Sequence, residues 1–471
     1  MFPFVQTPTF PDNPNARFMS ELVAAINSGD PVAMRSFADT RLNDDVLLGL
    51  GLANHARRLG KISSGSGGLR IERIDQDGSA VFVRTRQGNR LILLMGGVGP
   101  KGKGGYDLRR MPEGTASVRE HAWPKGPQAR DGVVRAIRGY LDSLAKRDLW
   151  NGVVLIAQGD RVLLHTAHGL AERSFGTRIG KGTKFNLASL GKMFTASMIG
   201  SLVDEGKLSL DDQLGRFRPD WPDVEARERV TVRMLLNHSA GFGGLFDSPG
   251  YDRSRRYVDA TDISTALYGE PLTFPPGSAW NYSNGGFVVL GSIIEKITGK
   301  PYEMAVRERL FRPLGMNASG WADGNEALPG LATVYDRDVM DPLGLEPKRR
   351  DGMFAGWRGG PHGGGYSNAG DLFRFARALR TGRLMKPSTV EEFLTVPPVA
   401  KGPNYALGFV KENFEGQTSI GHNGHARADL GIFWDLDLTV IALGNDLSEP
   451  VPLTANVIRR FIAQNAAAFK N

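Results

Sequence analysis

The sequence predicts an α+β fold, and three observations support this class. Near the start of the chain, segments of helical period are followed by segments in which apolar and polar residues alternate. From residue 129 onward, a predicted helix over 129–146 is followed by a strand hairpin around the turn Gly159-Asp160, and strands return only in the last third. Loops and helices alternate between these two groups of strands. The simplest arrangement is an antiparallel sheet built from both ends of this region, flanked by helices and interrupted by a helical region.

The length of the chain indicates more than one domain. Its 471 residues exceed what a single hydrophobic core usually supports. Residues 1–15 carry four prolines and are expected to form an extended arm. A small α+β accessory domain is expected over residues 16–112, followed by a proline- and glycine-containing linker over 113–128. Residues 129–471 would then form the larger domain.

The accessory domain is expected to consist of three helices followed by four strands. Helical periodicity begins at Ala16, a second helix starts after Asp30, and a third is predicted over residues 44–59. Alternating patterns and the turns between them predict strands over 69–74, 80–86, 90–95 and 106–110. This order resembles the cone-shaped fold of nuclear-transport-factor-like accessory domains, which implies one curved sheet.

A glycine-rich stretch, Gly97–Gly104, nearly matches a phosphate-binding loop. Gly104 stands where such a loop carries its metal-binding Ser or Thr, and no helical pattern follows it. We therefore interpret the stretch as a flexible connection between two strands.

Composition and charge exclude several functional classes. The chain is 41% hydrophobic and 23% charged, which is typical of a soluble globular protein. The absence of cysteine excludes disulfides, thiolate metal sites and a cysteine nucleophile. The formal charge of +8 comes from small scattered basic groups without interleaved aromatic residues, so no nucleic-acid partner is expected. No apolar run approaches the roughly 18 residues of a membrane span.

The compartment and the oligomeric state stay open at the level of the sequence. The first residues lack the charged and apolar regions of a signal peptide, so the chain as it stands is expected in the cytoplasm. If a leader has been removed, a periplasmic or secreted protein is expected instead. The accessory domain could mediate dimerisation, close over an active site or bind a separate ligand.

Chemistry is first indicated by the stretch Phe185–Phe194, which places Ser189 and Lys192 three residues apart near the expected start of a helix. Residues at this spacing share a helix face, so the serine hydroxyl and the lysine amine can meet. A serine becomes a nucleophile when a neighbouring base accepts its proton, and a lysine of lowered pKa can be that base. Taken alone, the pair fits an ordinary helix start capped by the serine equally well.

Two later motifs, in order along the chain, raise this pair above chance. Tyr282 and Asn284 form a Tyr-x-Asn about ninety residues downstream, shortly after a Pro-Pro-Gly turn. His422 and Gly424 form a His-x-Gly just before the last predicted strands, and His425 follows directly.

From about residue 130 to its end, the chain resembles the penicillin-binding-protein/β-lactamase superfamily of serine hydrolases. It is most similar to the class C β-lactamase-like branch, which also contains D-amino-acid peptidases and the family VIII carboxylesterases. The resemblance implies an antiparallel sheet flanked by helices, with a separate helical region. Six stretches carry it: Ser189-Leu-Gly-Lys192, Val232–Gly241, Phe274-Pro-Pro-Gly277, Tyr282-Ser-Asn284, Gly364–Asp371 and His422-Asn-Gly424.

The resemblance also implies roles for these residues. Ser189 would be the nucleophile that accepts the acyl group, and Lys192 would be the base that takes its proton. Tyr282 would assist this step and pass a proton to the leaving group, while Asn284 would hold the substrate through its side-chain amide. The backbone N–H groups of Ser189 and His425 would stabilise the oxyanion. This chemistry needs no metal, and no cofactor is expected.

The last motif is expected to contact the substrate through His422, Gly424 and His425. Many β-lactamases and transpeptidases carry a lysine at the position of His422, where it helps to hold substrate carboxylates. Histidine is largely neutral at pH 7 unless its pKa is perturbed. A histidine in place of this lysine favours a carboxylesterase that acts on small esters, with a β-lactamase or a D-amino-acid peptidase as the alternative. A catalytically inactive binding protein on the same scaffold is a further alternative, against which the intact catalytic residues argue.

A metal site is the competing interpretation of the two histidines in the last motif. His422 and His425 lack an indicated third ligand, and a single strand would point them to opposite faces of its sheet. No metal is therefore expected.

Several other residues have a structural and a functional interpretation. His238 lies in a loop, Asn237–Gly241, that resembles a family motif, and it is expected to shape the fold rather than to react. Candidates for lining the acyl pocket, for each of which core packing is an equal alternative, are Trp280, Phe242 and Tyr366.

Overall fold

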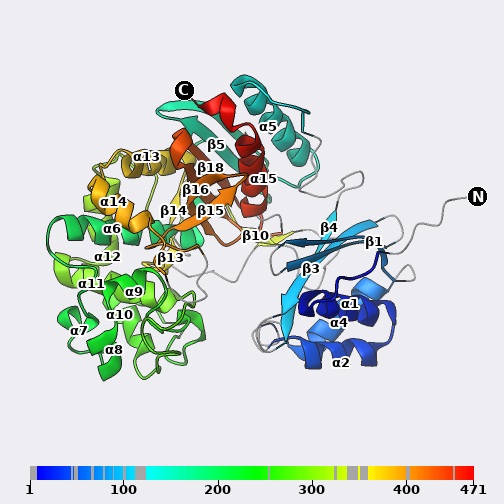
Figure 1. Cartoon of the computed structure of the whole chain (residues 1–471), viewed down its shortest axis with the longest axis horizontal. Coiled ribbons are helices and arrows are strands. Elements are labelled where there is room, and N and C mark those ends of the chain that lie inside the picture. The colour runs from blue at the N-terminus through cyan, green and yellow to red at the C-terminus, as the bar shows by residue number, and fades with distance from the viewer. Residues whose placement is uncertain are drawn as a thin grey trace, which may run out of the picture. The chain divides into compact units, whose positions relative to one another are not determined.

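The computed structural model describes residues 8–43, 46, 51–64, 68–77, 80–87, 90–98, 102–111, 123–252, 255–322, 326–336, 348–350, 359–398, 404–448 and 451–470. Much of the predicted arm and linker lies outside these ranges. The chain divides into two compact units (Figure 1), of which the first is Met1–Ala122 with Tyr335–Arg350 and the second is Trp123–Val334 with Asp351–Asn471.

The first unit begins with helices whose starts are set by local sequence. Asn13 accepts a hydrogen bond from the backbone N–H of Ala16 at 3.0 Å, and Asp30 accepts one from that of Val32 at 2.9 Å. Both helices have a proline in their first turn, where a backbone N–H has no partner within the helix. The helices of this unit are α1 (Pro14–Asn27), α2 (Pro31–Arg41) and α4 (Leu52–Ser63).

The prediction of one continuous helix over residues 44–59 is wrong. Helix α4 begins at Leu52, because Gly51 has a φ of +82°, which a right-handed helix cannot contain. Residues 44, 45 and 47–50 lie outside the described residues. The four predicted strands are confirmed and are longer than expected: β1 (Arg70–Asp77), β2 (Ala80–Gln87), β3 (Arg90–Val98) and β4 (Gly104–Met111), in the antiparallel order β1-β2-β3-β4.

The second unit contains a six-stranded antiparallel sheet built from both ends of its sequence. Its strand order is β15-β16-β17-β18-β5-β6. The early hairpin joins the late strands through β5 and β18, which pair from Gly152 with Gly444 to Gln158 with Leu438. This confirms the predicted arrangement. The strands are β5 (Gly152–Gln158), β6 (Arg161–His168), β15 (Val410–Phe414), β16 (Gln417–Gly424), β17 (Ala428–Phe433) and β18 (Leu438–Gly444).

Helices cover both faces of this sheet, because alternate side chains of its central strands are apolar on both sides. In β5, Val153 and Leu155 belong to the larger core, whereas Val154 and Ile156 belong to a second core. The second core is closed by α5 (Arg130–Ala145) and α15 (Val451–Gln464). The larger core contains α6 (Lys192–Asp204), α11 (Asn284–Thr298) and α13 (Ala369–Arg380), which lie on the opposite side of the sheet (Figure 1).

The apolar pattern of residues 405–410 predicts a strand, and this prediction is wrong except for Val410, where β15 begins. Gly408 has a φ of +86° and Ala406 N donates to Phe409 O at 2.7 Å, so residues 406–409 form a tight turn. The apolar residues of this segment are buried as core side chains, which explains the strand-like pattern. A neighbouring strand was missed: β16, which carries His422.

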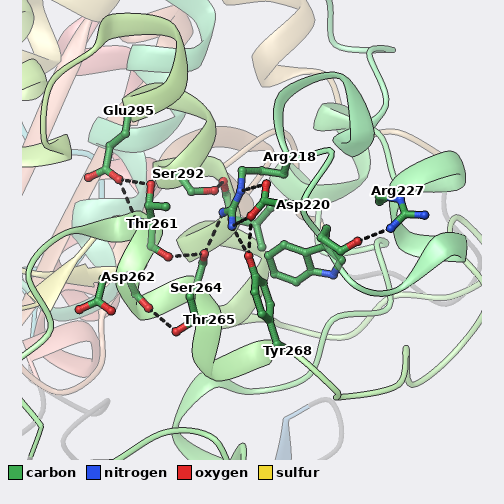
Figure 2. A network of polar contacts seen from close by, with 12 residues as sticks. Arg218, Asp220, Arg227, Thr261, Asp262, Ser264, Thr265, Tyr268, Ser292 and Glu295 are labelled. Carbon is green, nitrogen blue, oxygen red and sulfur yellow. Dashed lines mark hydrogen bonds and ion pairs between the residues drawn. The ribbon is translucent and has the colours of Figure 1, made fainter.

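The helical region is held by a polar network around two buried charges (Figure 2). Arg218, only 4% exposed, binds both carboxylate oxygens of Asp220 at 3.0 and 2.8 Å and the hydroxyl of Ser264 at 2.9 Å. Glu295 of α11 accepts hydrogen bonds from the backbone at the first turns of two short helices, α10 and α12. Besides α10 (Ala260–Ser264) and α12 (Tyr302–Val306), the region includes α7 (Leu214–Phe217), α8 (Val224–Arg229) and α9 (Val232–Leu236), and α14 (Pro387–Leu394) follows α13.

Candidate active site

Ser189 lies in a tight turn between a short strand and a helix. The turn is a single 3-10 turn over Ala188–Gly191, and α6 begins directly after it, at Lys192. Ala188 has a φ of 44°, in the left-handed region, and its N–H donates to the side chain of Asn186 at 3.0 Å. Neither the turn nor α6 has a side-chain cap, so the hydroxyl of Ser189 is not used as a helix cap. It remains available for contacts with other side chains.

Lys192 is completely buried one turn from Ser189. Its Nζ lies 3.4 Å from the Ser189 Oγ and 2.7 Å from the side-chain oxygen of Asn284, and it also binds the backbone carbonyl of His362. These partners are all uncharged. Burial takes the amine out of water and holds the pKa of Lys192 well below its usual range.

Tyr282 lies over the same amine and contacts the same hydroxyl. The Lys192 Nζ is 4.7 Å from the centre of the Tyr282 ring. Burial raises the pKa of the Tyr282 phenol, and a hydrogen bond with the Ser189 side chain opposes this rise only in part. The phenol is therefore neutral over the physiological range.

The start of α11 places Asn284 beside the lysine. The Ser283 side chain caps this helix, accepting from the N–H of Gly286 at 2.9 Å, so that Asn284 is its first residue. Because the side-chain oxygen of Asn284 accepts from Lys192, only its NH₂ group can donate toward a bound molecule.

The end of β16 approaches the Ser189 turn closely. A Cβ atom at Gly424 would lie 1.9 Å from the backbone oxygen of Leu187, so only glycine permits this approach. His425 follows the strand end with a φ of 51°. The expectation that His422 and His425 point to opposite faces is wrong, because both line the same cavity: His425 lies beyond the regular strand to which the alternation applies.

His422 is buried and makes a hydrogen bond with each ring nitrogen. Its Nδ1 lies 2.5 Å from the backbone oxygen of Asn423 and its Nε2 lies 3.0 Å from the hydroxyl of Tyr405. A carbonyl can only accept, so Nδ1 carries the proton and Nε2 accepts from the tyrosine. Burial, and then the nearby charge of Lys192, lower the pKa of His422 to about 3. The side chain is neutral at pH 7.

A cavity of about 340 Å³ opens at Ser189. Of the three aromatic residues considered from the sequence, Trp280 lines it. Phe242 packs edge-on against Trp221 in the core, and Tyr366 lies beneath the amine of Lys184. The lining residues are Ser189, Trp280, Tyr282, Asn404, Tyr405, Val410, His422, Asn423 and His425.

Two contributors to the site were not predicted from the sequence. Tyr405 orients His422, and the carbonyl of His362 holds Lys192. The only sequence signal for the second is the glycine run that begins at Gly363. A Cβ atom at Gly363 would lie 2.7 Å from the backbone oxygen of Ala188, so glycine at this position allows close backbone packing at the site.

Within the described residues, no group of three or more His, Asp or Glu side chains is placed to hold a metal ion. No helix of these ranges is both long and apolar enough to cross a membrane.

The fold and the site bring together the groups that a serine hydrolase needs: a serine hydroxyl, a buried lysine and a tyrosine meet in a cavity beside an antiparallel sheet flanked by helices. Residues 134–464 match the family described as Beta-lactamase, and the chain belongs to this family.

Comparison with individual proteins supports the same class. Penicillin-binding protein 4* of Bacillus subtilis (strain 168) is 31% identical over 297 residues, which are 60% of this chain and 64% of that protein. Esterase EstB of Burkholderia gladioli is 29% identical over 318 residues, which are 60% of this chain and 80% of the esterase. The solved structure of a penicillin-binding protein from Bacillus halodurans shares the fold, with a TM-score of 0.59 at 24% identity over 68% of this chain and 99% of its own.

Proposed function

We propose that the protein is a carboxylesterase that forms an acyl-enzyme on Ser189, with neutral Lys192 as the base. The observation that carries this proposal is the set of three contacts around the Lys192 Nζ. A neutral amine has two N–H groups and one lone pair. The oxygens of Asn284 and His362 can only accept from it, so they take both N–H groups. The lone pair is left for the Ser189 hydroxyl, which is the arrangement that general-base catalysis requires.

In the proposed acylation step, the proton of Ser189 moves to Lys192 while Oγ forms a bond to the ester carbonyl carbon. Collapse of the tetrahedral intermediate breaks the bond to the leaving alkoxide, which takes a proton through Tyr282. The raised pKa of Tyr282 and the lowered pKa of Lys192 favour the lysine as the base and the phenol as a neutral relay. In deacylation, water attacks the acyl carbon and loses its proton to the same groups, and Ser189 leaves with a proton as the acid is released.

The oxyanion would be held by the backbone N–H groups of Ser189 and His425. The close approach of Gly424 to the turn before Ser189 supports this assignment. Hydrogen-bond donors of this kind act strongly because they are in place before charge develops, in a site with little water.

Uncharged acyl groups are the substrates we propose, because the cavity wall offers no cation at His422. Its proton points to the backbone and its other nitrogen accepts from Tyr405, so a substrate carboxylate would meet a neutral ring. Burial of a carboxylate without a partner is costly. Among the relatives, EstB is named an esterase and the Bacillus subtilis protein a penicillin-binding protein, and our proposal follows the first.

Two measurements test the proposal. A fluorophosphonate should label the wild-type protein at Ser189 and leave the variant S189A unlabelled; folded wild-type protein that stays unlabelled would overturn it. Turnover of p-nitrophenyl butyrate should exceed that of nitrocefin and of a D-alanyl-D-alanine peptide. A preference for the lactam or the peptide would instead assign a β-lactamase or a D-amino-acid peptidase.

The same assay can test whether the protein prefers uncharged over charged acyl groups. We expect kcat/KM for p-nitrophenyl butyrate to exceed that for mono-p-nitrophenyl succinate by about tenfold or more, which corresponds to about 1.4 kcal/mol of uncompensated charge. Equal use of both esters would contradict the proposed preference for uncharged acyl groups.

A further inference from the structure

His238 forms hydrogen bonds with the loop that carries Tyr282. It follows α9, and its backbone oxygen accepts from the N–H of Asn281 at 3.1 Å. Its ring nitrogen Nδ1 accepts from the N–H of Ser283 at 3.1 Å. One residue therefore binds the chain on both sides of Tyr282, through its backbone on one side and its side chain on the other.

The ring of His238 also supports the Tyr282 ring directly. The two ring centres are 4.4 Å apart, and the ring of Tyr405 lies 4.5 Å away. His238 is 1% exposed, so these aromatic contacts enclose it. Packing of this kind leaves little room for the Tyr282 side chain to shift.

The contact with Ser283 requires a neutral histidine. A protonated ring would carry a hydrogen on Nδ1 and could no longer accept from the Ser283 N–H. Burial holds the pKa of His238 well below its usual range, and any positive charge on Lys192 or His422 would lower it further. The lowered pKa of His238 is therefore consistent with the neutral ring that the hydrogen bond from Ser283 requires.

The backbone of His238 is itself in an unusual conformation. Its φ is 64°, in the left-handed region, which is uncommon for residues other than glycine and which asparagine, aspartate and histidine adopt more often than the rest. The turn is fixed by Asn237, whose side chain accepts from the N–H and the hydroxyl of Ser239 at 3.1 and 2.6 Å. A strained conformation persists where its surroundings determine it, and it is often found at functional sites.

We propose that His238 is a positioning residue that holds the phenol of Tyr282 against the hydroxyl of Ser189. The inference rests on the proposed function of Ser189, and it extends that function to a residue that does not touch the substrate. Displacement of a catalytic group by about 1 Å can reduce a rate about 100-fold. Loss of the His238 contacts should therefore affect the chemical step rather than substrate binding.

The first test compares His238→Asn with His238→Leu in the full-length protein. Asparagine keeps an acceptor on the atom equivalent to Nδ1 and tolerates a positive φ, whereas leucine keeps apolar bulk and removes the acceptor. We expect H238L to lose about 100-fold in kcat for p-nitrophenyl butyrate with KM changed less than about threefold. H238N should stay within about tenfold of wild type. If H238L does not fold, His238→Gly takes its place, since it relieves the positive φ and also removes the acceptor.

A matched control separates positioning from general loosening. Thr231 caps α9, the helix that leads into His238, through a 3.3 Å contact with the N–H of Met234. Thr231→Ala should lower the thermal midpoint but change kcat by less than about twofold. A loss of kcat in T231A as large as in H238L would overturn the proposal.

The decisive test is a double-mutant cycle with Tyr282→Phe. If His238 acts through the phenol, adding H238L to Y282F should change kcat by less than about threefold. An undiminished 100-fold loss in the Y282F background, or equal losses in H238N and H238L, would refute the positioning role. Wild-type protein that neither turns over esters nor is labelled at Ser189 would instead refute the proposed function.

Discussion

The close approach of Gly424 to the Ser189 turn leads to a quantitative prediction for Gly424→Ala. The added Cβ would lie 1.9 Å from the backbone oxygen of Leu187, whereas real Cβ contacts stay beyond 3.0 Å. The end of β16 would therefore have to move from the turn by about 1 Å, and with it the N–H of His425. Because about 1 Å of misplacement can cost about 100-fold in rate, we expect kcat/KM for p-nitrophenyl butyrate to fall by about that factor. Overpacking should also lower the free energy of unfolding by about 1–3 kcal/mol.

The assay pairs ester kinetics with urea unfolding and uses Gly139→Ala as control. Gly139 lies in α5, and a Cβ atom there would meet nothing within 4 Å. That variant should keep wild-type kinetics and gain up to about 1 kcal/mol in stability, because alanine favours helix. A loss of kcat/KM below about fivefold in folded G424A would show that the N–H of His425 does not need this approach, and would refute the reasoning.

Four further predictions concern single groups. Activity should fall on the acid side as Lys192 protonates, because the pKa of Lys192 is lowered and its neutral amine, present above that pKa, is the base. A flat pH profile between about pH 5 and 9 would contradict this role, and K192M should lose about 100- to 10,000-fold in kcat. Glu295→Ala leaves three backbone N–H donors unpaired, two of them buried, and should cost about 3–5 kcal/mol in urea unfolding, with Glu295→Gln losing about half as much. His422→Lys should raise the relative kcat/KM for the succinate ester, and an unchanged ratio of the two esters would argue against a role for this position in acyl selection. Trp123 stacks on Phe461 with ring centres 3.9 Å apart, so a chain that begins at Trp123 should have a higher thermal midpoint than one that begins at residue 128.

The groups that meet at Ser189 were predicted where the chemistry is local in sequence. Ser189 and Lys192 lie one turn apart, so their contact follows from helix geometry. Tyr282 and Asn284 were found through motif order, and the structure brings both to the lysine. Their catalytic roles remain predictions.

The parts that were missed depend on contacts between distant segments. The carbonyl of His362 reaches Lys192 across 170 residues, and no local pattern marks a backbone oxygen as a partner. Tyr405 was placed in a strand because its segment is apolar, yet its hydroxyl orients His422. The prediction that His422 and His425 point to opposite faces failed because His425 has a positive φ and lies beyond the regular strand. In each case tertiary contacts, rather than local preference, decide the position of the group.

The pairing of β5 with β18 has a consequence for how the protein is made. About 280 residues separate Gln158 from its partner Leu438, so the hairpin leaves the ribosome long before the strand that completes its sheet. At synthesis rates of about 5–20 residues per second, that interval is about 14–56 s. Throughout it, β5 exposes an unpaired edge and two apolar faces, a state prone to aggregation. We therefore expect the nascent chain to need protection, by a chaperone or by its own helical region, until the last strands arrive.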